Sequence, residues 1–215
     1  NNINKKLKVT GDLEFTGTLY KDGVEVGGGT FNGVQYISGS NVSIYISGDD
    51  TTHANATGQG NVSLGTGCLT SIALGQENIA IGKDSLNSVT NTSNNIAIGS
   101  EALESCISNY NIGIGYLSGR YITSGSNNIA IGFSSMDRQD VGDSNVAIGE
   151  ESLYYFNNGS GNVALGKKAL YGNMSNSGGN HNIGIGSLAG LGVKNGNKNI
   201  CIGYFAGPTD AMKDY

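Results

Sequence analysis

A five-residue motif, Asn-(Ile/Val)-small-(Ile/Leu)-Gly, recurs through most of this chain at a nearly constant interval. Its nine copies begin at Asn61, Asn78, Asn95, Asn111, Asn128, Asn145, Asn162, Asn182 and Asn199. Subtracting successive asparagine numbers gives intervals of 17, 17, 16, 17, 17, 17, 20 and 17 residues. A unit this short cannot bury a core alone, so the repeat predicts a solenoid in which each copy forms one coil of a stack.

Two branched apolar residues flank the small residue of each motif. Side chains alternate between the two faces of a strand, so the branched pair points one way and the small residue the other. We expect the branched pairs to fill the core of each coil. The clearest of these predicted core residues are Ile79, Ile81, Ile96, Ile98, Ile129, Ile131, Val146 and Ile148.

The opposite face of each predicted strand carries a row of very small side chains. Such residues allow two backbones to approach closely, and a coil of 17 residues buries little apolar surface within itself. We therefore expect this row to be the contact between chains in a homotrimer. The predicted trimer contacts are Ala80, Ala97, Gly113, Ala130, Ala147, Ala164, Gly184 and Cys201.

A second signature follows the glycine of most copies, as in Ser85-Leu86, Ala102-Leu103 and Ser152-Leu153. It predicts a second short strand or bend that returns one large apolar residue per coil to the core. The rest of each coil is rich in Ser, Asn and Gly, which are turn residues because they bond nearby backbone groups or adopt positive φ cheaply.

The composition favours an all-β chain. It has 36 Gly, one Pro, no Trp and 13% charged residues, and its apolar residues are too regularly spaced for a disordered segment. Three cysteines, Cys68, Cys106 and Cys201, have unrelated spacing and imply no disulfide framework. Cys68 and Cys201 stand where other copies have Ser, Ala or Gly, so we expect small buried residues there.

Net charge limits the partners of the chain. The formal net charge is −5 and the pI about 4.9, with scattered Lys and Arg, so nucleic acid is not an expected partner. No apolar run reaches membrane-spanning length, and we expect no membrane insertion by this segment. The chain begins at Asn1 without a signal peptide, and we expect it to be a piece of a longer protein whose anchor lies elsewhere.

The sequence divides into four regions. Residues 1–33 alternate apolar and polar residues and predict a β arm with a hairpin at Lys21-Asp-Gly-Val24. Residues 34–60 predict an irregular β segment that forms a degenerate first coil. Residues 61–208 are the repeat domain, and residues 209–215 are a tail.

Residues suited to catalysis are few. The two histidines, His53 and His181, lie in Asn- and Gly-rich loops, and the carboxylate pairs Asp49-Asp50 and Glu150-Glu151 are neighbours that face opposite ways in a strand. The calcium-binding nonapeptide pattern is absent. We predict a non-enzymatic chain without catalytic residues, cofactor or metal, and keep a solenoid enzyme acting on polysaccharide as a remote alternative.

The repeated Asn-Ile-Ala-Ile-Gly-x-x-Ala-Leu resembles the YadA-type head repeat of trimeric autotransporter adhesins and related repeats in phage and large-virus fibres. The resemblance covers residues 61–208 and implies a left-handed parallel β-roll, trimerised along its axis. It also implies an extracellular attachment role, on a virion fibre or a bacterial cell surface. The stretch from Leu7 to Val24 is similar to segments that precede such heads in viral fibres, which favours a viral source.

Binding residues are expected where the repeat is interrupted. The coil of 20 residues carries an insertion within residues 172–181, and insertions in solenoids project from the surface. Tyrosines nearby could stack on the sugars of a host glycan or contact a host protein, or instead cover the roll edge or the trimer seam. The predicted receptor-facing residues are Tyr154, Tyr155, Tyr171, His181, Arg120 and Tyr121.

Two functions follow from these patterns. The first is a structural and attachment segment of a trimeric surface fibre, with outer loops facing the host. The alternative is a subunit of an extracellular filament, in which the arm at the N-terminus adds a strand to the next subunit.

Overall fold

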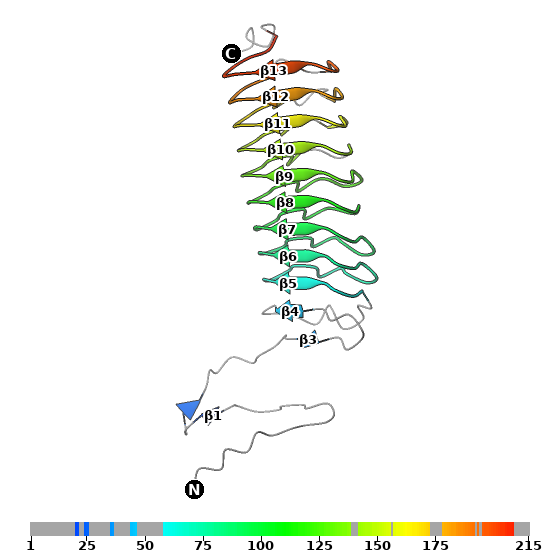
Figure 1. Cartoon of the computed structure of the whole chain (residues 1–215). Helices are drawn as coiled ribbons and strands as arrows, with labels where there is room; N and C mark the ends of the chain where they lie inside the picture. The colour runs from blue at the N-terminus through cyan, green and yellow to red at the C-terminus, as the bar shows by residue number, and fades with distance from the viewer. Residues whose placement is uncertain are drawn as a thin grey trace. The chain divides into compact units, whose positions relative to one another are not determined.

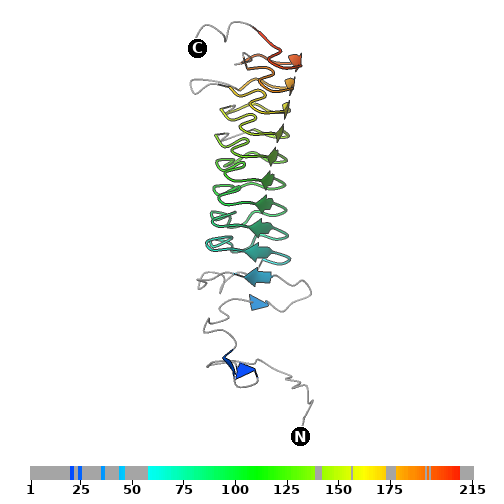
Figure 2. The ribbon, with the colours of Figure 1, turned by 90° about the vertical axis from the view of Figure 1, so that its left-hand side faces the viewer.

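The computed structural model describes residues 58–138, 142–155, 157–172, 178–191, 193 and 195–208, together with four short strands nearer the N-terminus. The chain divides into two compact units, Asn1–Phe31 and Asn32–Tyr215. The second unit is a stack of coils, each of which contributes one strand (Figure 1). These strands lie above one another on a single side of the stack (Figure 2).

Nine three-residue strands form the parallel sheet of the repeat domain. All pair in register, so that Val146, for example, lies between Ile129 and Val163. This arrangement confirms the predicted all-β solenoid with about 17 residues per coil. The strands are β5 (Val62–Leu64), β6 (Ile79–Ile81), β7 (Ile96–Ile98), β8 (Ile112–Ile114), β9 (Ile129–Ile131), β10 (Val146–Ile148), β11 (Val163–Leu165), β12 (Ile183–Ile185) and β13 (Ile200–Ile202).

Four shorter strands precede the repeats. β1 (Tyr20–Lys21) and β2 (Val24–Glu25) pair antiparallel, and the Asp-Gly turn predicted between them lies outside the described residues. β4 (Ile44–Ile46) pairs parallel with β5 and so joins the solenoid sheet, while β3 (Gln35–Tyr36) pairs antiparallel with β4. The rest of the predicted arm and the tail at residues 209–215 lie outside the described residues.

The asparagine that opens each coil points into the solenoid. The eight asparagines from Asn61 to Asn182 are fully buried. Each of their Oδ1 atoms accepts a hydrogen bond of 2.8 to 3.0 Å from the backbone N–H of the asparagine in the next coil, up to Asn199. We call this continuous column of bonds the asparagine ladder.

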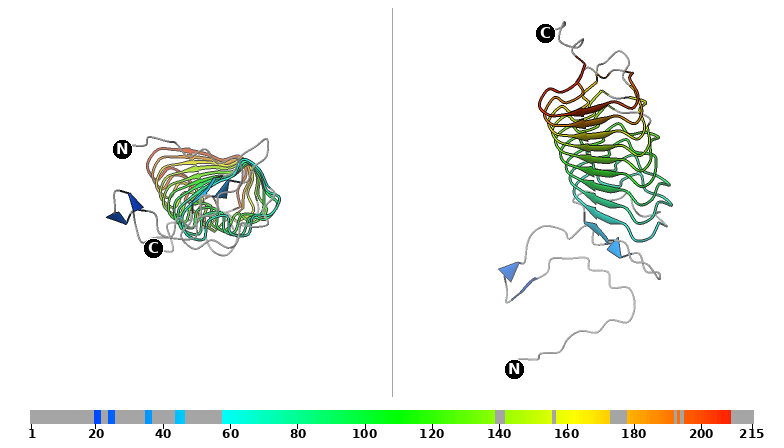
Figure 3. Two further views of the ribbon diagram at one scale, coloured as in Figure 1. Left: turned by 90° about the horizontal axis from the view of Figure 1, so that it is seen from below. Right: turned by 45° about the horizontal axis from the view of Figure 1, so that its top comes forward.

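The same side chains also close the coils on themselves. Asn78 Nδ2 donates to Thr92 O at 2.8 Å, and Asn145 Nδ2 donates to Gly159 O at 2.8 Å, so the start of a coil is bonded to its end. Seen along the stack, the coils form outlines of similar shape, each slightly offset from the one before (Figure 3). Because a buried amide without partners costs several kcal/mol, full bonding of these side chains is a condition of the fold.

The small residues share the interior with the ladder, so the predicted trimer contacts are wrong. Ala80, Ala97, Ala130, Ala147 and Ala164 are fully buried within a single chain, Gly113 and Gly184 are also buried, and Cys201 is 6% exposed. A side chain enclosed by its own coil cannot contact a neighbouring chain.

The prediction that the branched strand residues fill the core is also wrong, because these residues lie on the outer face of the strands. Ile79, Ile81, Ile96, Ile129, Ile131 and Val146 are half-buried, and Ile98 and Ile148 are 37% and 41% exposed. The reason is parity along the strand. Asparagine and the small residue stand two apart and share a face, and the asparagine must reach carbonyl groups inside its own coil. The branched residues between and beyond them are therefore turned outward.

Large apolar residues enter the interior from the other side of the coil. Leu69, Leu86, Leu103, Met136, Leu153 and Leu170 are 0 to 1% exposed, which confirms that the second signature returns one apolar residue per coil. They fill the space beside the small row, since a methyl group built on Gly113 would lie 2.8 Å from Leu103 Cγ. The residues of this second signature form turns rather than a second strand.

The three cysteines are free and buried, and none forms a disulfide. Cys68 and Cys201 occupy interior positions of the repeat, as predicted for small buried residues. Burial raises the pKa of the Cys106 thiol, which belongs to the same interior.

The glycine after each strand is required by the stacking of the coils. Gly132 has φ of 130°, a conformation that other residues rarely adopt, and a methyl group built on it would lie 2.7 Å from Gly149 O. The equivalent glycines of neighbouring coils meet in the same way, backbone against backbone. This contact explains why the fifth position of the motif never varies.

We predict that Asn128→Ala strongly destabilises the chain. The substitution leaves the backbone N–H of Asn145 and the carbonyl of Gly142 without their partners. At about 1 to 3 kcal/mol per buried unsatisfied group, the free energy of unfolding should fall by about 3 to 5 kcal/mol in urea titrations. Asn91→Ala, at an exposed asparagine outside the ladder, is the matched control and should change it by less than about 0.5 kcal/mol. Equal effects of the two substitutions would contradict the ladder.

Candidate functional site

The outer face of the strands forms one continuous apolar surface, which we call the apolar stripe. It consists of the first and third residue of each strand from β5 to β13, and every one is Ile, Val or Leu. In-register pairing aligns these side chains in two columns along the stack. With nine strands about 4.8 Å apart, the stripe is about 38 Å long.

Such a surface is unusual on an isolated chain. Parallel sheets are normally covered on both faces, and a solvated face normally alternates with polar residues. A long, straight row of exposed branched apolar side chains is typical of a surface that binds another apolar surface. Among the described residues of this chain, only the inner face of the sheet is covered.

A second distinctive surface lies nine and ten residues past the ladder asparagines, about half a coil from the strands. Here the Ser, Thr and Asn of the early coils are replaced by charged and aromatic residues. We call this surface the arginine–tyrosine cluster. It comprises Arg120, Tyr121, Asp137, Arg138, Tyr154, Tyr155 and Tyr171, together with Glu101, which lies six residues past Asn95 and pairs with Arg120.

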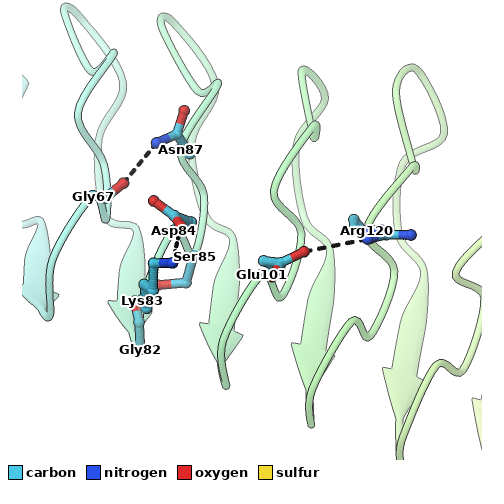
Figure 4. Close-up of polar contacts among 8 residues, drawn as sticks. All are labelled: Gly67, Gly82, Lys83, Asp84, Ser85, Asn87, Glu101 and Arg120. Atoms are coloured by element: carbon cyan, nitrogen blue, oxygen red, sulfur yellow. Dashed lines mark hydrogen bonds and ion pairs between the residues drawn. The ribbon is translucent and has the colours of Figure 1, made fainter.

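Arg120 lies at the centre of the charged half of the cluster. Its Nε donates to Asp137 Oδ1 at 2.9 Å and its Nη1 to Glu101 Oε2 at 3.2 Å, so it bridges the coils on either side (Figure 4 shows the bond to Glu101). Its guanidinium also lies 4.5 Å from the centre of the Tyr121 ring, and that of Arg138 lies 5.6 Å from it. The geometry fits cation–π contact.

Three tyrosines form the aromatic half of the cluster. The rings of Tyr154 and Tyr171 stack with centroids 5.5 Å apart and planes 7° from parallel, while Tyr155 lies nearly perpendicular to both. Tyr154 is also hydrogen-bonded to Asp137 and Arg138, which joins the two halves. The result is a half-buried surface with aromatic carbons and polar groups side by side, a combination suited to binding sugars.

The carboxylates near Arg120 differ in their electrostatics. The Asp137 side chain is 1% exposed, and burial raises the pKa of its carboxyl although the Arg120 guanidinium acts in the opposite direction. Burial and the nearby Glu101 also raise the pKa of Glu104. At both carboxyl groups burial therefore disfavours the charged form.

Five of the six predicted receptor-facing residues are brought together by the fold, since Arg120, Tyr121, Tyr154, Tyr155 and Tyr171 all belong to the cluster. His181 does not belong to the cluster, because it lies next to Asn182, just before strand β12. Its backbone N–H donates to Ser160 O at 3.0 Å. Residues 173–177 of the predicted insertion lie outside the described residues.

Sequence reasoning missed two participants. Asp137 anchors Arg120 and Tyr154 but has no motif of its own. The sequence did contain a signal for Asp137. It lies nine residues past its ladder asparagine, the same position that Arg120 occupies in the neighbouring coil. The apolar stripe was recognised as a pattern but assigned to the wrong face.

Residues considered for catalysis have structural partners where they are described. Glu150 and Glu151 form ion pairs of 3.0 and 3.2 Å with Lys167 and Lys168 of the next coil. His53 lies outside the described residues. In the part of the chain that is described, no group of three or more His, Cys, Asp or Glu side chains could hold a metal ion, and no helix could span a bilayer.

Comparison with known proteins adds no relative. No protein-family model, no curated protein and no solved structure matches the chain.

We predict that Glu104→Gln stabilises the chain at neutral pH. A folded-state pKa above the ordinary value of 4.5 means that folding favours the protonated carboxyl. Its contribution is fully present below pH 4.5 and is lost as the pH rises through the folded pKa. Urea unfolding should therefore show the variant to be more stable than the parent at pH 7, with a difference that shrinks toward pH 4. A difference that grows on acidification would contradict this account.

Proposed function

We propose that this chain is a structural and attachment segment of a trimeric surface fibre, whose solenoids associate lengthwise through the apolar stripe. The observation that carries the proposal is the uninterrupted row of outward-facing branched side chains on β5 to β13. Burying it removes apolar surface from water at roughly 25 cal/mol per Å². The trimer contact is thus proposed at the Ile, Val and Leu side chains, in place of the enclosed alanines.

A second copy of the chain is the occupant that the stripe fits best. Its rungs repeat at the spacing of the strands, so a surface that matches it over about 38 Å needs the same period along the same direction. An identical solenoid lying parallel has that period. The number three comes from the resemblance to the trimeric head repeats, and three stripes can be buried together around a common axis.

The arginine–tyrosine cluster supplies the attachment surface of this proposal. Its residues lie about half a coil from the strands, so they face outward when the strands face the fibre axis. Half-buried tyrosines that pack against one another lose little conformational entropy when a sugar binds. The expected ligand is a host-surface glycan or glycoprotein, and the expected location is the outside of a virion or a cell.

One observation favours the filament alternative. Among the described residues, β13 pairs only with β12, and Ile200 and Ile202 of β13 are 68% and 65% exposed. An open strand edge accepts a further strand, which the arm of another subunit could provide. Light scattering separates the two, because end-to-end addition grows with concentration whereas lengthwise association stops at a closed oligomer.

We predict that the double substitution Ile129→Thr and Ile131→Thr weakens self-association. Each half-buried isoleucine contributes roughly 1 kcal/mol of burial at the contact, so the association constant should fall by at least about tenfold in sedimentation equilibrium. Ile107→Thr, at an isoleucine 57% exposed outside the stripe, is the matched control and should leave association unchanged. A parent chain that sediments as a monomer at all concentrations would rule out the assembly.

We predict that Tyr154→Ala with Tyr155→Ala abolishes attachment without disturbing assembly. The pair removes most of the aromatic half of the cluster while Arg120 keeps both of its carboxylate partners. On an array of neutral and acidic glycans, the double variant should give only background signal for every glycan that the parent chain binds. The control Leu74→Ala, at an exposed apolar residue elsewhere, should bind the same glycans as the parent. Unchanged binding by the tyrosine variant would assign attachment to another surface.

A further inference from the structure

A stripe of nearly identical rungs does not by itself fix how two copies align along their length. Sliding one solenoid by a single coil, about 4.8 Å, exchanges each Ile or Val rung for another of the same kind and exposes only the terminal rungs. Parallel copies would therefore populate several registers of similar stability. A unique alignment needs side chains next to the stripe that differ from coil to coil.

Two such rows flank the stripe. The leading row is the residue immediately before each ladder asparagine, and the trailing row is the residue immediately after the glycine that ends each strand. Both rows face solvent in the isolated chain: Glu77 and Tyr110 of the leading row are exposed, as are Lys83 and Tyr116 of the trailing row. Unlike the stripe, these rows vary in charge and size along the stack.

We propose that the two rows set the register of parallel copies, the trailing row of one chain meeting the leading row of the next at the same level. This inference rests on the lengthwise self-association proposed above. When the stripes of three chains face a common axis, the trailing row of each chain lies beside the leading row of the next chain. The partner whose side chains match these two rows is thus a second copy of this chain.

At three of the nine levels, the in-register arrangement brings complementary side chains together. Lys83 of one chain faces Glu77 of its neighbour, Tyr116 faces Tyr110, and Tyr204 faces Lys198. These are an ion pair, an aromatic pair and a cation–π pair.

The charged pair cannot form within one chain. Lys83 and Glu77 stand at opposite ends of an extended segment six residues apart, or roughly 20 Å. Lys83 does lie 3.6 Å from Asp84 of its own chain, but its side chain is 68% exposed and its ammonium has further protons to donate (Figure 4).

Sliding by one coil removes the charged pair in either direction. In one slip Lys83 faces Asn94, and in the other it faces Gly60. Glu77 then faces Thr66 or Ser100, neither of which carries charge. The in-register arrangement is therefore the one that satisfies both ions.

Disulfide trapping tests this register, because a disulfide requires Cα atoms within about 7 Å. Asn94→Cys with Ser100→Cys reports the proposed register, since one residue lies in each row at the same level. Asn127→Cys with Glu150→Cys reports a slip of one coil. Cys68, Cys106 and Cys201 are buried and do not interfere. Each reporter pair is too far apart to close within a chain, so a covalent oligomer on a non-reducing gel measures contact between chains.

The expected result is a covalent trimer from the first reporter and none from the second. Adding Lys83→Glu places like charges at one level of all three seams, so cross-linking of the first reporter should fall about threefold and that of the second should rise. Adding Glu77→Lys as well should restore the original pattern. Thr90→Glu with Ser124→Glu makes the same change in net charge at exposed positions away from the seam and outside the arginine–tyrosine cluster, and should have no effect.

The outcomes separate the two proposals. Failure of both reporters in a chain that sediments as a monomer overturns the lengthwise assembly itself. Cross-linking of the slip reporter instead of the first overturns the register, and so does a Lys83→Glu variant whose pattern is unchanged or is not restored by Glu77→Lys.

Discussion

The asparagine ladder is the interaction on which the rest of this fold depends. Each amide bonds the next coil through its oxygen and its own coil through its nitrogen, so one side chain both stacks and closes the solenoid. These bonds require the asparagine to point inward. Everything else in the repeat follows from that direction: the small residue two places later is also inside, and the branched residues beside it are outside.

The division of faces explains how a thin rod can have distinct working surfaces. The interior is filled by small residues and by one leucine or methionine from the far side of most coils, which leaves no room for the strand isoleucines. Those isoleucines form a straight apolar stripe suited to lengthwise association. The arginine–tyrosine cluster lies about half a coil away from this stripe. Assembly and attachment, as proposed, therefore use opposite sides of one coil.

The spacing of the sequence was sufficient for the period, the stacked coils and the buried leucines. The parallel direction of the strands entered only as what the resemblance to the head repeats implied. The faces were predicted the wrong way round because the argument placed the largest apolar residues inside by default. The asparagine carried the correct signal. A polar residue that never varies and shares a face with Ala97 or Ala147 is explained by buried hydrogen bonds, and burial of Asn95 requires Ile96 to be outside.

The candidate site was predictable in part for a similar reason. Tyr154, Tyr155 and Tyr171 were conspicuous as aromatic residues, and the coil spacing brings them together with Arg120 and Tyr121. Asp137 could not be singled out, since its role depends on contacts with two neighbouring coils. Whether His181 belonged to the same surface depended on its position within the coil, which the interrupted spacing of its repeat obscured.

Hydrogen exchange of asparagine side chains, followed by NMR on the isolated chain, tests the inward ladder most directly. The account predicts that the carboxamide protons of the buried asparagines, such as Asn95, Asn128 and Asn145, exchange far more slowly than those of exposed Asn91 and Asn197. Equally rapid exchange in both groups, in a chain that remains folded, would place the ladder in water and contradict the assignment of every face derived from it.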